Sequence, residues 1–524
     1  MDTLHNLMIG FGVALQPLAL TMMTIGLLLG LAIGVLPGLG GTAGVALLLP
    51  LTVLVKPEVA IIFLAAIYWG ALFGGVITSV LFAIPGEPWS VALIFDGYPM
   101  AKQGKAGLAL TAAFLSSFLG LFIASIFFVI AALPLALFAL RFGPPEMFAI
   151  MLLAFSTFVG LGTGSPSKTL ISTAFGIILT MAGLDIVTGQ PRLAFGSISF
   201  LSGFHFVPVT IGLFGLGEIL VDGEGRFTSE IKRVISAKVG LKDLKEGLKA
   251  IKAHFPITLF SSFLGFFVGV LPGTGATPAS FLAYGIAKQY SKTPEKYGQG
   301  AIEGVIAPQA AANAAGTGAL LPMIALGVPG SPTAAVLLAG LYMWGLWPGP
   351  RLFIEQPVFV WGLIASLFLA GVVCLLICLL GVPLLAAIMR IPWGLLTPII
   401  VIACFIGSYV MRNLMFDVWV TLIFGLVGYV MKKLHYPLAP LAVALVLGDM
   451  TERFLRQSLI MGDGSFGIFF TRPISAAFML IAISLFLLPA IKTFKGKFQR
   501  VALARRRHTQ EEDGREKPLK EGIS

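Results

Sequence analysis

Four proline-glycine breaks interrupt long apolar stretches of this 524-residue sequence. They lie at residues 37–41, 85–88, 272–275 and 329–332. Proline removes a backbone donor and glycine permits a positive φ, so a helix unwinds there and leaves backbone N–H and C=O groups without helical partners. The amides at the start of a new half-helix suit an anionic ligand, and the freed carbonyls suit a cation. We therefore predict that the breaks form a binding site for an anionic substrate.

The candidate ligand-binding residues are the glycines and prolines of the breaks together with nearby hydroxyl and amide groups. One break alone is more readily explained as a packing kink, but four breaks with adjacent hydroxyls favour a site. Asn313 lies in an alanine-rich run, where a packing hydrogen bond is as good an explanation as ligand contact. The predicted substrate-binding residues are Gly38, Gly40, Thr42, Pro85, Gly86, Gly273, Thr274, Gly275, Thr277, Asn313, Thr317, Gly330 and Ser331.

Two carboxylates lie in or shortly after the second break. Glu87 lies within this break and Asp96 follows it, so either could neighbour a coupling cation or cap a helix. Glu452 and Arg456 are four residues apart in an expected helix, and we predict a structural ion pair between them.

Other reactive constellations are missing from the sequence. There is no Ser/His/Asp order, no HExxH and no phosphate-binding GxxxxGK motif. The three cysteines all lie in apolar segments without metal-ligand spacing. We predict that the protein is not an enzyme and uses no cofactor.

The elements that position the breaks are membrane helices. Apolar residues make up 57% of the chain and charged residues 11%, and the mean hydropathy is +0.96, which lies outside the range of soluble domains. Uniformly apolar stretches recur from residue 17 to residue 491, enough for about ten to twelve crossings of about 20 residues each. Because they do not alternate as barrel strands do, we predict an all-α polytopic membrane protein with re-entrant or broken helices.

Positive charge is concentrated in two segments. Of 35 Lys and Arg residues, eight lie between Val221 and His254 and ten from Lys492 onward. Basic loops stay in the cytoplasm, so residues 221–254 are predicted to be a cytoplasmic linker and residues 492–524 a cytoplasmic tail. This distribution explains the net charge of +11 without a nucleic-acid partner.

The breaks also repeat. Residues 34–40 align with residues 269–275 at an offset of 235 with one mismatch, and residues 84–88 align with 328–332 at an offset of 244. One lysine, Lys56, follows the first break, whereas Lys288, Lys292 and Lys296 follow the third. This asymmetry predicts hairpins that open to opposite sides, and hence two inverted repeats, residues 1–220 and 255–491.

The sequence resembles the TctA family, the large permease subunit of the tripartite tricarboxylate transporters. The resemblance covers almost the whole chain and is carried by residues 34–52, 67–107, GLDIVTGQPRLAFG at 183–196, and above all residues 269–341. It implies a multi-pass transporter of the bacterial inner membrane. It also implies a small TctB-like membrane subunit, a periplasmic TctC-like solute-binding protein, and uptake of di- or tricarboxylates on an ion gradient.

The resemblance does not determine which carboxylate is transported or which ion is coupled to transport. Many relatives read Pro-Glu-Ala-Ala-Asn-Asn-Ala where this chain reads Pro308-Gln309-Ala-Ala-Ala-Asn313-Ala, and Leu93 and Ile94 stand where relatives often carry threonines. Fewer polar groups fit a less charged carboxylate, so citrate does not follow. The spans carry no obvious Asp/Glu/His relay, which favours Na⁺ over H⁺ as the coupling ion. An uncoupled channel for small organic anions is the alternative function.

Overall fold

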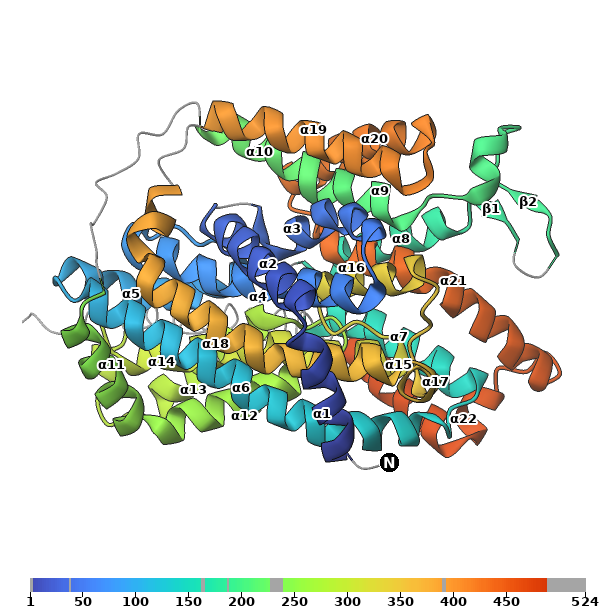
Figure 1. The fold of residues 1–524 in the computed structure, drawn as a ribbon. Helices are drawn as coiled ribbons and strands as arrows, with labels where there is room; N and C mark the ends of the chain where they lie inside the picture. Colours follow the sequence, from blue (N-terminus) through green and yellow to red (C-terminus); the bar gives the residue numbers. More distant parts are fainter. Residues whose placement is uncertain are drawn as a thin grey trace, which may run out of the picture.

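The computed structural model describes residues 3–36, 39–161, 165–185, 188–226, 239–388 and 393–487. Helices make up most of this part of the chain, and its two short strands form one hairpin (Figure 1). The prediction of an all-α polytopic protein is confirmed. The predicted tail at 492–524 lies outside the described residues.

The first half runs from α1 to α10. Its elements are α1 (Thr3–Ala14), α2 (Pro17–Val35), α3 (Gly40–Leu48), η1 (Leu49–Leu54), α4 (Pro57–Phe82), η2 (Pro88–Ser90), α5 (Val91–Lys102), α6 (Ala106–Ala139), α7 (Pro144–Leu161), α8 (Pro166–Thr180), β1 (Gly183–Leu184), β2 (Pro191–Arg192), η3 (Ile198–Ser202), α9 (Phe206–Thr210), the π-helix η4 (Ile211–Leu216) and α10 (Gly217–Arg226).

The second half runs from α11 to α22. Its elements are α11 (Leu241–Ala253), α12 (Phe255–Val270), α13 (Ala276–Gln289), η5 (Pro294–Lys296), α14 (Glu303–Gly318), α15 (Leu320–Leu326), α16 (Pro332–Met343), α17 (Pro350–Glu355), α18 (Pro357–Ile388), α19 (Trp393–Arg412), α20 (Met415–Lys433), α21 (Leu438–Met461) and α22 (Ile468–Thr471).

Five helices in the described part of the chain are long and apolar enough to span a membrane, namely α2, α4, α6, α18 and α20. The pair α11–α12 makes a sixth candidate, bent by 74° at the break between the two helices. Seven shorter apolar helices, including α3, α7 and α16, occur in the described part of the chain. The expected ten to twelve crossings stay a prediction. The shorter helices are not long enough to span a membrane singly, so two of them would have to combine into one span.

The centre of the molecule is built on α4 and its counterpart α14. Every residue from Val59 to Leu81 in α4 is buried, as is every residue from Gly304 to Gly318 in α14. Leu72 of α4 lies against Gly316 of α14, and a Cβ on this glycine would lie 2.9 Å from the leucine Cδ1. These two positions are counterparts at the offset of 244. A residue that contacts its own counterpart is expected where two copies face each other across a two-fold axis.

The glycine stripes before the breaks make the same contacts in both halves. A Cβ on Gly34 would lie 2.3 Å from the backbone oxygen of Ala71, and one on Gly269 would lie 2.2 Å from that of Ala315. Only glycine lets the helix backbones approach so closely. Close helix packing therefore explains these glycines, and the inverted repeats stay a prediction that these contacts support.

A second, smaller hydrophobic cluster lies beside the main core. It joins α8, α9, η4, α20 and α21 through residues such as Leu179, Leu213, Phe424 and Leu441. In Figure 1 the helices α10, α19 and α20 form a layer above the body that contains α2 and α4.

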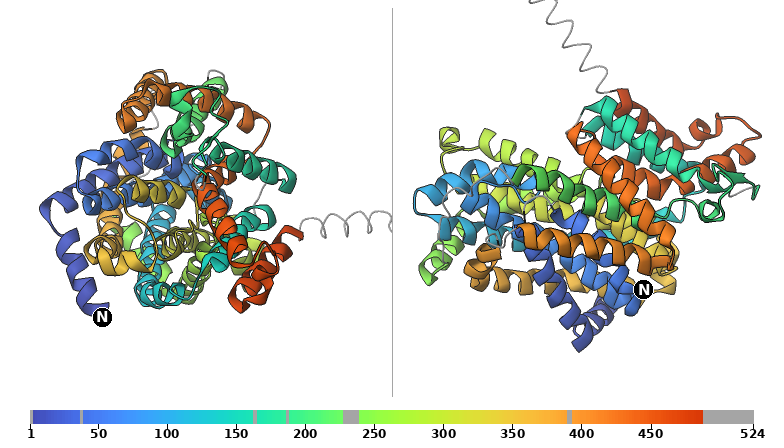
Figure 2. Two further views of the ribbon diagram at one scale, coloured as in Figure 1. Left: turned by 90° about the vertical axis from the view of Figure 1, so that its right-hand side faces the viewer. Right: turned by 90° about the horizontal axis from the view of Figure 1, so that it is seen from above.

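The β hairpin projects from the end of the molecule opposite α11 (Figure 1 and the right-hand view of Figure 2). The predicted ion pair between Glu452 and Arg456 is present at 2.6 Å. It anchors the hairpin, because Arg192 of β2 pairs with Glu452 at 2.8 Å and Arg456 pairs with Asp185 at 2.9 Å. The hydrogen bond to Glu452 is the main cause that raises the pKa of Arg192.

Candidate functional site

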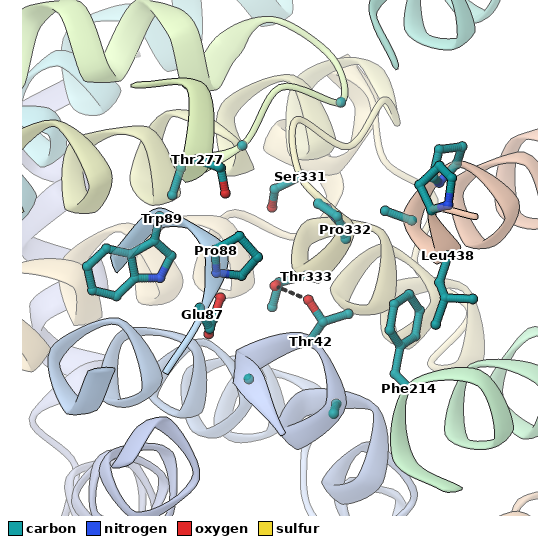
Figure 3. A pocket seen from close by; sticks show the side chains of 18 of the residues that line it. Thr42, Glu87, Pro88, Trp89, Phe214, Thr277, Ser331, Pro332, Thr333 and Leu438 are labelled. Carbon is teal, nitrogen blue, oxygen red and sulfur yellow. Dashed lines mark hydrogen bonds between the residues drawn. The ribbon is translucent and has the colours of Figure 1, made fainter. Parts of the chain in front are cut away.

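A cavity of about 750 Å³ lies where the broken helices meet the smaller cluster (Figure 3). One side is formed by the starts of α3, α13 and α16 and by the 85–89 segment. The other side is formed by Phe214, by Glu218 of α10 and by residues 436–440, where α21 begins. The cavity therefore lies between the broken helices on one side and η4, α10 and the start of α21 on the other.

Most of the predicted binding residues line this cavity. They are Gly40, Thr42, Pro85, Gly86, Gly273, Thr274, Gly275, Thr277 and Ser331. The structure thus brings together the breaks at 85–88, 272–275 and 329–332 and the described end of the break at 37–41. Gly38 of that break lies outside the described residues. Their role in substrate binding stays a prediction.

Three predicted residues do not line the cavity. Asn313 and Thr317 are fully buried in α14, where the Asn313 amide donates to the Gln309 carbonyl oxygen at 3.0 Å and the Thr317 hydroxyl to the Asn313 carbonyl oxygen at 3.2 Å. A Cβ on Gly330 would lie 2.3 Å from the Gly269 oxygen. The Asn313 Oδ1, in contrast, is buried without a hydrogen-bond partner among the described residues. The role of these three residues in binding stays a prediction.

Asp96 also lies away from the cavity. Its side chain is fully buried, and its Oδ1 accepts hydrogen bonds from the backbone N–H groups of Gly298, Gly300 and Ala301 at 2.8–2.9 Å. Its Oδ2 accepts the Tyr284 hydroxyl at 2.9 Å. The carboxylate therefore fixes the loop after η5 to α5. The prediction that it neighbours a cation stays untested, but its oxygens have protein partners.

Glu87 is the carboxylate that faces the cavity. Its Oε1 accepts a hydrogen bond from the Gly41 N–H at 2.5 Å, so it caps the start of α3 from 46 residues away. Its own backbone is fixed by Ser90, whose hydroxyl donates to the Glu87 carbonyl oxygen at 2.8 Å. No nitrogen of a described Lys, Arg or His side chain lies within 4 Å of this carboxylate, and the amide end of α3 lies against it.

The equivalent position in the second half is Ser331. Its hydroxyl accepts a hydrogen bond from the Ala334 N–H at 3.1 Å and so caps α16, and the Tyr68 hydroxyl lies 3.5 Å away. Gly275 has a φ of +65° and donates its N–H to the Gly330 oxygen at 3.0 Å. The positive φ explains why glycine is needed at this turn before α13.

The two halves are joined beside the cavity by reciprocal contacts. Thr42 of α3 and Thr333 of α16 share a hydrogen bond of 2.8 Å (Figure 3). Ser280 of α13 donates to the Trp89 carbonyl oxygen at 2.9 Å. Each half thus places the helix after its first break against the second break of the other half.

Several residues of the wall were missed by the sequence analysis. They are Tyr68, Trp89, Phe158, Phe214, Glu218, Lys432 and Tyr436. Glu218 and Lys432 form an ion pair and lie at the ends of apolar segments. In a sequence, charged residues at the ends of apolar segments are interpreted as residues that fix the membrane topology. This interpretation gives no indication that the pair lines a cavity.

Comparisons with known proteins match the chain to one family model and to two similar proteins. The sequence profile described as "Tripartite tricarboxylate transporter TctA family" matches residues 20–443. A protein from Agrobacterium vitis named "Uncharacterized 52.8 kDa protein in TAR-I ttuC' 3'region" is 37% identical over 505 residues, covering 95% of this chain and 99% of the relative. A second Agrobacterium vitis protein, "Uncharacterized protein in TAR-II ttuC' 3'region", is 38% identical over 235 residues, which are 44% of this chain and 96% of the relative. No solved structure matches the chain.

Proposed function

Since the chain belongs to the tripartite tricarboxylate transporter TctA family, we propose that it moves carboxylates through the bacterial inner membrane on a cation gradient. It is a multi-pass membrane subunit of a transporter. In the proposed cycle the substrate binds in the cavity between the breaks, and the cavity opens to each side of the membrane in turn.

The observation that carries the cation coupling is the Glu87 carboxylate. It faces a cavity that would receive an anion, and no nitrogen of a described cationic side chain lies within 4 Å of it. Two negative groups in a poorly solvated site repel each other strongly. A cation bound beside Glu87 removes this repulsion, so substrate and cation bind more tightly together than apart.

The surrounding atoms favour Na⁺ over a proton. The hydroxyls of Thr42, Ser331 and Thr333 line the same cavity as Glu87, and neutral and charged oxygens are the ligands of hard cations. The amide end of α13, with the Thr277 hydroxyl, supplies donors for a substrate carboxylate. In this proposal the cation thus binds beside Glu87 and the anion binds beside these donors, at adjacent places in the cavity.

Partners follow from the family and from the shape of the chain. Its described elements are membrane helices and short connections, without a soluble domain that could capture a solute. We infer that a periplasmic TctC-like protein delivers the carboxylate and that a small TctB-like membrane subunit completes the complex. Uptake by this chain alone at micromolar substrate should be negligible.

The orientation follows from the basic segments. The lysine-rich helix α11 lies at the end of the molecule opposite the β hairpin. If the linker 221–254 is cytoplasmic, the hairpin end faces the periplasm and is the side that receives the binding protein. Labelling of single cysteines at residues 240, 510 and 195 tests this arrangement, since the first two should be accessible from the cytoplasm and the third from outside.

The decisive experiment is uptake into proteoliposomes that contain this chain, its small membrane subunit and the loaded binding protein. Radiolabelled citrate, malate and succinate are offered with and without an inward Na⁺ gradient. Accumulation above the external concentration that collapses with a Na⁺ ionophore supports the proposal. Equilibration without accumulation would instead indicate the uncoupled channel, and accumulation driven only by a proton gradient would refute Na⁺ coupling.

A further inference from the structure

One ion pair, between Glu218 and Lys432, lies in the wall of the cavity. Lys432 is the single Lys, Arg or His among the described residues that line the cavity. Its side chain keeps 28% of its surface exposed, compared with 13% for Glu218. Lys432 is therefore the more exposed member of the pair and carries the one positive charge among the described residues that line this cavity.

The fold holds this pair in place by two helix ends. Glu218 lies in the first turn of α10 and Lys432 in the last turn of α20, and the two helices pack against each other. An acidic residue at a helix start and a basic residue at a helix end are each stabilised by the helix dipole. The pair is thus fixed on the smaller cluster, across the cavity from the breaks that carry Glu87 and Ser331.

The neighbouring pair provides a contrast. Lys433 pairs with Glu224 at 2.6 Å, and both side chains are about half exposed. The Lys433 ammonium also lies over the Tyr429 ring, 5.0 Å from the centroid, and neither member of this pair lines the cavity. Two adjacent lysines in one helix thus have similar partners but different surroundings, one facing the cavity and one facing outward.

We propose that Lys432 binds a carboxylate of the transported substrate and that Glu218 competes with the substrate for it. This inference rests on the proposed function. An ammonium has three N–H donors, and Glu218 is the one partner of Lys432 among the described side chains. Donors therefore remain for a second carboxylate, while the charge of Glu218 weakens the attraction enough to permit release.

The arrangement also indicates the class of substrate. One carboxylate is held by Lys432 on the side of α10 and α20, and the amide end of α13 on the other side receives a second. In Figure 3, Phe214, four residues before Glu218, lies on the opposite side of the cavity from Glu87 and Trp89. An acid with at least two carboxylates makes both contacts, so di- and tricarboxylates are preferred over monocarboxylates.

The test uses the reconstituted complex and whichever of citrate, malate and succinate the unaltered protein transports best. Lys432→Gln should raise KM at least tenfold with a smaller change in kcat, whereas Lys433→Gln, the matched control, should leave both within twofold. Glu218→Gln keeps an acceptor for Lys432 but removes the competing charge, so KM should fall severalfold and kcat should fall as release slows.

A charge swap separates substrate binding from a structural role. Glu218→Lys combined with Lys432→Glu rebuilds the ion pair and should restore folded protein, judged by its melting temperature, but not uptake. Wild-type uptake in the swapped protein, or a KM within twofold of wild type in Lys432→Gln, would overturn the inference. Failure of the unaltered complex to transport any of the three acids would instead count against the proposed function on which it rests.

Discussion

The two proline-glycine breaks at 84–90 and 328–334 share a backbone arrangement but differ in chemistry. A Cβ on Gly86 would lie 2.4 Å from the Gly34 oxygen, and one on Gly330 would lie 2.3 Å from the Gly269 oxygen. Directly after these glycines the first break carries Glu87 and the second carries Ser331. A charged group therefore faces the cavity from one half and a neutral hydroxyl from the other.

The comparison separates the residues that helix packing requires from the residues that are available for ligand binding. Both breaks need glycine because a neighbouring helix backbone passes within contact distance. The next side chain is free of that constraint, and it caps a helix in both cases, α3 through Glu87 and α16 through Ser331. A duplicated framework can thus carry two different ligand groups at equivalent places.

The largest effect is expected from the shared packing. Gly86→Ala and Gly330→Ala each force a methyl group into a backbone oxygen that cannot move away, which should cost about 3 kcal/mol of stability and most of the folded protein. Gly285→Ala is the matched control, because nothing lies within 4 Å of its Cβ position. Thermal unfolding in detergent measures the difference, and a break variant as stable as the control would contradict the shared framework.

The second-largest effect is expected from Glu87, whose equivalent in the second half is a serine. Glu87→Gln keeps the shape of the side chain and an acceptor for Gly41 but removes the charge, so we expect uptake to fall about 100-fold and to lose its dependence on Na⁺. The folded fraction should be unchanged. Glu355→Gln, on the exposed face of α17, is the control. Sodium-dependent uptake at a normal rate in Glu87→Gln would show that the carboxylate only caps α3.

A smaller effect is expected from the equivalent residue of the second half. Ser331→Ala removes the acceptor for the Ala334 N–H, which should cost about 1 kcal/mol of stability. Uptake should fall only a fewfold and should keep its dependence on Na⁺. A loss of coupling as complete as in Glu87→Gln would mean that the two breaks share the cation equally.

The smallest effect concerns the contact between the halves. Thr42→Val and Thr333→Val each break the 2.8 Å hydrogen bond between α3 and α16, at a cost of about 1 kcal/mol. The double variant should cost little more than either single change, because both remove the same bond. Fully additive losses in the thermal unfolding of the three variants would show that the two hydroxyls act separately.

The structure also changes how one glycine can be tested. Gly273 has a φ of +77°, and its Cβ would lie 2.4 Å from the ring of Phe158 in α7. Alanine there is strained by its backbone and by this ring, so a loss of uptake in Gly273→Ala has to be measured per folded molecule. Gly38, its counterpart in the first half, lies outside the described residues.

The sequence by itself determined the membrane class, the all-α fold and the positions of the breaks. Hydropathy and proline-glycine pairs are local properties, since each reports on a helix or its interruption without reference to the rest of the chain. The repeat offsets of 235 and 244 also identified counterparts, such as Gly34 and Gly269, that make equivalent contacts in the structure.

The tertiary structure alone decided which polar groups face the cavity. Glu87 and Asp96 are nine residues apart, yet the first faces the cavity and the second holds the loop at 298–301. Lys432 and Lys433 are adjacent, yet only the first lines the cavity. Such assignments depend on partners 46 to 205 residues away, as for Glu87 with Gly41 and Asp96 with Ala301. Residue type and spacing carry no information on these partners, because helix packing between distant segments sets the direction of each side chain.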